Sequence, residues 1–148
     1  MNQTAKGAAL CSLLGILLTL VGCGYAKHKD PKVYYESSAA AARMAAELHA
    51  RDIAASVYQN QCCGSMEPLI FAGDWIVAKA ETYNDELLGK AVSYRRANGQ
   101  LILHRLVSGN AKNGFIASGD NNKRSEPDER VDRNNYLETC VAIYKVAK

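Results

Sequence analysis

Residues 64–77 read GSMEPLIFAGDWIV, and this stretch combines a serine on a bend with the start of an apolar strand. Gly64 precedes Ser65 and permits backbone angles that other residues rarely adopt, while Pro68 fixes φ three residues after the serine. A serine hydroxyl is a weak nucleophile unless a fixed geometry holds it beside a base. Two interpretations therefore stay open from these residues alone, a reactive serine or an ordinary turn.

Short apolar segments at regular spacing follow this stretch and predict a compact, mainly β domain. The Asn98-Gly99 pair is typical of a tight hairpin, and Asn113-Gly114 indicates a second turn. Residues 81–88 are polar, which favours a loop or a single helical turn. We expect strands at 75–78, 91–94, 101–107, 114–118 and 135–145.

A long N-terminal helix is predicted over residues 31–58. Asp30 and Pro31 match an N-cap followed by proline at the first helical position. The following segment is rich in alanine and contains no glycine and no further proline, and Glu47 and Arg51 are spaced for an i,i+4 ion pair. We expect this helix to be a spacer or to lie on the domain. A membrane-surface helix is less favoured because its basic face is sparse.

The first 23 residues have the features of a targeting segment. Lys6 precedes a nearly continuous apolar run at 8–21. This run is shorter than the ~20 residues of a spanning helix and is typical of a secretory signal. It ends in Leu20-Val21-Gly22-Cys23, which looks like a bacterial lipobox whose cysteine receives lipid. A lipid on Cys23, a cleaved signal and a retained membrane anchor all stay open. Each predicts a membrane-associated, extracytoplasmic protein of the cell envelope.

Composition and cysteine content narrow the function classes. The chain has 148 residues, 48% of them hydrophobic, which is enough for one domain with a sizeable core. Its net charge of +3 is too small to indicate nucleic-acid binding. Beyond Cys11 and Cys23, one of the adjacent Cys62 and Cys63 could bridge to Cys140, or all three could be buried thiols. No Cys-x-x-Cys or Cys/His spacing indicates a metal site.

His104 is the candidate general base. It lies in an apolar segment, where a histidine is either a buried structural residue or a base with an ordinary pKa of about 6.5. If His104 takes the proton of Ser65, an acid should orient its other ring nitrogen. The candidates are Asp120, in Gly-Asp-Asn-Asn at 119–122, and Asp128, in an acidic segment. Each of these two could instead be a turn former or a solvated loop charge.

Taken in order, these motifs resemble the type I signal peptidase family. They are Ser-Met-x-Pro at 65–68, Gly-Asp at 73–74 with its strand, His-Arg at 104–105, Gly-Asp-Asn-Asn at 119–122 and a later acid. The chain is most similar to the endoplasmic-reticulum and spore-former branch, in which histidine replaces the catalytic lysine. The resemblance runs from Gly64 to about Arg130. Self-cleaving repressors of the DNA-damage response share the clan but use lysine.

The resemblance implies a signal-peptidase-like β-barrel or sheet and a membrane-associated serine endopeptidase. Ser65 is then the nucleophile and His104 the general base. Asp128, close to Arg130, fits best as the orienting acid, and Asp120 is the second candidate, a position that more often serves structure in the family. The implied partners are secreted preproteins cut after small residues, and the membrane. No metal or organic cofactor is implied.

Three segments are therefore predicted: a signal, lipoprotein or membrane-anchor segment at 1–23, a linker and helical stalk at 24–60, and a catalytic β domain at 61–148. Besides a general signal peptidase, two functions stay open. One is a dedicated processing peptidase for a single partner, and the other is a non-catalytic lipoprotein that uses the β fold as a binding module. Candidates for an apolar face that docks on the membrane are Met66, Leu69, Ile70 and Phe71.

Overall fold

A computed structural model describes residues 26–61, 64–122 and 129–148 of the chain. Within these residues the fold is mainly β, as the sequence predicts, and the five expected strands are confirmed with small changes at their ends. They are β3 (Trp75–Lys79), β4 (Ala91–Arg95), β5 (Leu101–Asn110), β6 (Gly114–Ser118) and β8 (Tyr136–Val146). The polar segment between β3 and β4 contains a single 3₁₀ turn, η2 (Asp85–Leu87).

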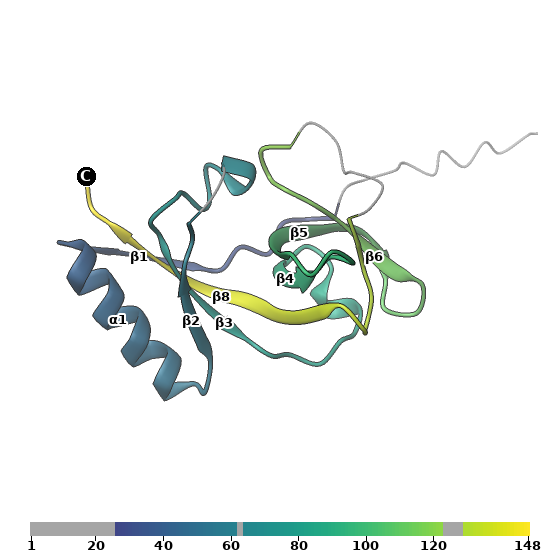
Figure 1. Ribbon diagram of the computed structural model, residues 1–148, viewed down its shortest axis with the longest axis horizontal. Coiled ribbons are helices and arrows are strands. Elements are labelled where there is room, and N and C mark those ends of the chain that lie inside the picture. The colour runs from purple at the N-terminus through teal and green to yellow at the C-terminus, as the bar shows by residue number, and fades with distance from the viewer. Residues whose placement is uncertain (1–25, 62–63, 123–128) are drawn as a thin grey trace, which may run out of the picture.

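The strands of the described residues form one sheet that curls into a half-barrel (Figure 1). Its order is β2-β3-β8-β4-β5-β6-β7, where β2 is Ser56–Gln59 and β7 is Arg130–Val131. The long strand β8 pairs with β3, with β4 and, in parallel, with β1 (Lys32–Glu36). Register shifts interrupt the pairing of β8 with both β3 and β4. Such irregularities increase the local twist, which helps the sheet to curl.

The prediction of one long helix over residues 31–58 is wrong. The segment is divided among β1, a short helix α1 (Ala39–Asp52) and β2. Val33, Tyr34 and Tyr35 favour strands and pair with the end of β8, a distant partner that overrides the local helical pattern. The helix begins where the Ser38 hydroxyl accepts a hydrogen bond from the Ala41 N–H at 3.2 Å, and it ends before Ala54, whose φ is 52°.

Helix α1 lies against the sheet and does not stand apart as a stalk (Figure 1). It buries the small side chains of Ala42, Ala46 and Ala50, which recur every four residues along one face and pack on β3 and β8. Glu47 pairs with Arg43, at 2.7 Å between Oε1 and Nε. Strands β1 and β2 belong to the same sheet as β5, which carries His104, so residues 32–59 are part of one folded unit with that strand.

Of the four apolar residues that follow Ser65, Met66 and Ile70 are buried, Leu69 is partly buried and Phe71 is exposed. Met66 and Ile70 are 3% and 0% exposed and pack against β3 and β8, so these two residues cannot form a membrane-docking face. Phe71 is 38% exposed and lies under the ammonium groups of Lys145 and Lys148. The buried pair instead anchors the loop that carries Ser65.

Several sequence predictions fall outside the described residues, namely those on Cys23, Cys62, Cys63 and Asp128. Cys140 is a free, buried thiol on β8, and burial raises its pKa to about 12. No helix in the described part of the chain is both long enough and apolar enough to cross a membrane.

Candidate active site

Ser65 lies in a 3₁₀ turn, η1 (Gly64–Met66), within the loop that connects β2 to β3. Hydrogen bonds close the base of this loop: the Asn60 N–H donates to the Asp74 carbonyl and the Gly73 N–H donates to the Asn60 carbonyl, each at 2.8 Å. The Asp74 carboxylate also accepts from the Phe71 N–H at 2.8 Å. The Gly-Asp motif at 73–74 therefore fixes the loop that presents the serine.

A second loop, residues 119–122, clamps the serine from the other side. The Asn121 N–H donates to the Ser65 carbonyl at 2.8 Å, and its side-chain amide donates to the Gly64 carbonyl at 2.9 Å. A Cβ atom at Gly119 would lie 2.4 Å from the Ser65 carbonyl oxygen, closer than any real contact of this kind. Glycine is therefore required here by the close approach of the two loops.

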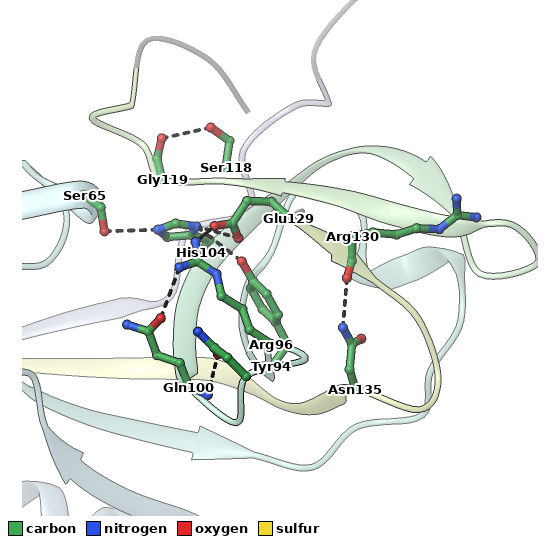
Figure 2. A network of polar contacts seen from close by, with 11 residues as sticks. Ser65, Tyr94, Arg96, Gln100, His104, Ser118, Gly119, Glu129, Arg130 and Asn135 are labelled. Carbon is green, nitrogen blue, oxygen red and sulfur yellow. Dashed lines mark hydrogen bonds and ion pairs between the residues drawn. The ribbon is translucent and has the colours of Figure 1, made fainter. Parts of the chain in front are cut away.

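His104 projects from β5 toward Ser65 (Figure 2). Its Nε2 lies 3.1 Å from the Ser65 Oγ, although the two residues are 39 positions apart in the sequence. Its Nδ1 lies 3.2 Å from Oε2 of Glu129. His104 is 6% exposed, and its imidazole is held between a hydroxyl and a carboxylate. This is the arrangement of nucleophile, base and orienting acid found in serine hydrolases.

Glu129 is the acid at the imidazole, and sequence reasoning did not select it. It precedes β7, is 1% exposed, and its carbonyl accepts from the Ala117 N–H of β6 at 2.7 Å. The predicted Asp128 is its neighbour and lies outside the described residues. One feature of the sequence could have indicated Glu129. Val131 is an apolar residue of the core, and residues two positions apart in an extended chain point to the same face, so Glu129 is expected to face inward as well.

Asp120 contacts Arg105 and makes no hydrogen bond to His104 among the described residues. Its two carboxylate oxygens accept from Nε and Nη2 of Arg105, both at 2.7 Å. Arg105 is 1% exposed and also donates to Asp30 and to the Gly89 carbonyl, each at 2.8 Å. The ion pair holds the 119–122 loop on β5, so Asp120 supports the loop that clamps Ser65.

The surroundings keep His104 neutral at physiological pH. Burial lowers the pKa of the imidazole, the guanidinium of Arg96 lowers it further and Asp120 opposes them, which leaves it at about 4. Because Glu129 accepts at Nδ1, we assign the proton of the neutral ring to Nδ1. The lone pair on Nε2 then faces the Ser65 hydroxyl, so the ring can accept that proton.

A cavity of about 580 Å³ opens beside Ser65 and His104. Residues at the end of β2 and the start of β5 line it, with apolar walls from Met66, Ile70 and Leu103. Within the described chain, β2 pairs only with β3, and β6 pairs with β5 only from Arg105 onward. Strand β2 and residues 101–104 of β5 therefore each present an unpaired backbone edge beside the cavity.

No group of three or more His, Cys, Asp or Glu side chains in residues 26–61, 64–122 and 129–148 is arranged to hold a metal ion. Comparison with known proteins gives no match to a family model, a curated protein or a solved structure. Function is therefore inferred from the positions of the side chains around Ser65.

Proposed function

We propose that this protein is a serine endopeptidase of the type I signal peptidase kind, with Ser65 as nucleophile, His104 as general base and Glu129 as orienting acid. The observation that supports it most is the chain of contacts from the Ser65 Oγ to His104 Nε2, at 3.1 Å, and from Nδ1 to Glu129, at 3.2 Å. The order of motifs along the sequence agrees with this family.

The proposed reaction is acyl transfer. His104 removes the proton of Ser65 through Nε2 while the Oγ attacks the scissile carbonyl carbon, and Glu129 stabilises the imidazolium that forms. The imidazolium then protonates the leaving amine, which breaks the peptide bond and leaves an acyl group on Ser65. Water, deprotonated by the neutral His104, hydrolyses this ester and restores the serine.

The cavity suits a peptide bound in an extended conformation. Unpaired backbone groups on β2 and on the start of β5 can form main-chain hydrogen bonds with such a segment, as in β-strand addition. Its side chains would then alternate between the apolar wall and solvent. Together with the family resemblance, this supports secreted preproteins with small residues before the cut as substrates.

Membrane association is part of the same proposal. The chain lies on the domain from Ala26 onward, because the Ala26 N–H donates to the Val107 carbonyl at 3.1 Å and the Lys29 N–H to the Gly89 carbonyl at 3.0 Å. A lipid on Cys23 would therefore hold the domain within a few residues of the membrane surface. The mass of the mature N-terminus distinguishes a lipidated chain from a cleaved or a retained segment.

Peptide cleavage tests the proposal. A peptide with an Ala-x-Ala site should be cut by the protein, and Ser65→Ala and His104→Ala should each abolish cutting without loss of folding. Ser108→Ala, a matched change at an exposed serine of β5, should keep full activity. Retained cleavage in Ser65→Ala contradicts the proposal. Turnover of one natural preprotein only would indicate a dedicated processing peptidase, and binding without turnover would indicate a binding module.

A further inference from the structure

The carboxylate of Glu129 has a second partner beyond the imidazole. While Oε2 faces His104, Oε1 is paired with the guanidinium of Arg96, from the hairpin that joins β4 to β5 (Figure 2). We propose that Arg96 is a positioning residue, which orients His104 by holding Glu129. This inference rests on the proposed function, and it adds a residue that the order of motifs does not contain.

The hairpin holds Arg96 in place. The Arg96 N–H donates to the Gln100 carbonyl at 2.9 Å, and the Arg96 carbonyl accepts from the Gly99 N–H at 2.9 Å. The side chain is fixed as well, because Nη1 donates to Oε1 of Gln100 at 3.2 Å while Nη2 points to Glu129. Its side chain is 26% exposed, so the pair is largely screened from solvent by the protein. The guanidinium thus reaches Glu129 from a rigid turn.

A buried carboxylate needs a fixed partner for each oxygen. Glu129 is 1% exposed, and a buried charge is costly unless it is paired and hydrogen-bonded. A neutral imidazole supplies one hydrogen bond and no counter-charge. Arg96 supplies the counter-charge at Oε1, and the attraction between the two groups favours the orientation in which Oε2 faces Nδ1.

The same contact sets the charge balance at the imidazole. The groups around His104 are Glu129 and the Tyr94 hydroxyl, at 3.2 and 3.4 Å from Nδ1, with Arg96 behind the glutamate and Asp120 beyond Arg105. Arg96 is the cation that lies behind the acid. Its removal leaves the negative charge of Glu129 uncompensated, which favours the imidazolium and raises the pH at which His104 takes up a proton.

Variants of Arg96 test the inference. Arg96→Met should lower kcat/KM by about 10- to 100-fold, the range seen when the outer partner of a metal-binding side chain is lost. The loss should fall mainly on kcat, and the acidic limb of the pH profile should move to higher pH. Arg96→Lys should recover part of the rate and keep the limb near its original position. Arg95→Met, the same change at the exposed neighbour, should leave both unchanged.

A double-mutant cycle with Glu129→Gln separates positioning from substrate contact, since Arg96 also lines the cavity. If Arg96 acts through Glu129, Arg96→Met should cost less than about threefold in the Glu129→Gln background. An equal loss in both backgrounds overturns the inference, as does a wild-type rate and pH profile in Arg96→Met. If Arg96→Met does not fold, Arg96→Gln replaces it in the same cycle.

A nitrogen-15 NMR titration of the His104 ring keeps this inference distinct from the proposed function. If the wild-type protein cuts no peptide, the peptidase proposal fails on its own. The titration midpoint of His104 still has to rise in Arg96→Met and stay unchanged in Arg95→Met. An unchanged midpoint in Arg96→Met overturns the role of Arg96, whatever the activity.

Discussion

Replacing Gly119 with alanine should lower the activity about 100-fold while leaving the fold intact. The added Cβ would lie 2.4 Å from the Ser65 carbonyl oxygen and 2.9 Å from the Ser65 Cβ, whereas an ordinary contact begins at 3.4 Å. To restore an ordinary contact at the carbonyl oxygen, the two loops must separate by about 1.0 Å. A displacement of about 1 Å at a reacting group can cost about 100-fold in rate, or about 2.7 kcal/mol in the activation free energy.

The assay is kcat/KM on an Ala-x-Ala peptide, with thermal unfolding measured on the same samples. Gly99→Ala is the matched control, because a Cβ at Gly99 meets nothing within 4 Å. Its φ of 85° costs an alanine about 1 kcal/mol of stability. We expect that cost without a comparable loss of activity. A Gly119→Ala protein that retains wild-type kcat/KM would refute the reasoning that the 119–122 loop sets the position of Ser65.

Two further predictions follow from charges in the site. His104 must be neutral to act as a base, and its pKa is lowered to about 4. We therefore expect kcat/KM to stay level from pH 8 to about 5.5 and to fall at lower pH, where the ring is protonated. A fall in kcat/KM centred near pH 6.5 would show that the protein does not perturb the imidazole, contrary to this account. Asp120→Asn breaks a buried pair with Arg105 and should lower the free energy of unfolding by about 3 kcal/mol. Asp30→Asn removes a partner of Arg105 that is 54% exposed and should lower the free energy of unfolding by only about 0.5 kcal/mol. Urea titrations of both variants measure these changes, and equal losses of stability would contradict this account of the ion pair.

The central strands were predictable because their signals are local. The apolar run 114–118 begins at a turn glycine, and β6 has the predicted bounds, Gly114–Ser118, whereas β5 continues three residues beyond the predicted end at 107. The long helix was wrong for the opposite reason. Residues 32–36 pair with β8, more than 100 positions away, and a local reading of an alanine-rich segment has no access to that partner.

The residues of the candidate site also differ in how far the sequence could predict them. Ser65 and His104 stand out by residue type and by the order of motifs, and the structure places them in contact. The acid could not be chosen from the sequence, because the adjacent Asp128 and Glu129 have the same chemistry, and only the position of Glu129 just before β7 brings its carboxylate to His104. Asp120 has a partner, Arg105, that only the pairing of β5 with β6 brings close.

An acyl-enzyme is the species that distinguishes a catalytic serine from one that merely lies beside a histidine. The direct measurement is the intact mass of the protein after it is mixed with an Ala-x-Ala peptide ester and quenched rapidly in acid, with the adduct located by peptide mapping. We predict one acyl group on Ser65, absent from Ser65→Ala. Hydrolysis of the ester with no adduct on Ser65, or an adduct that persists in Ser65→Ala, would contradict the account.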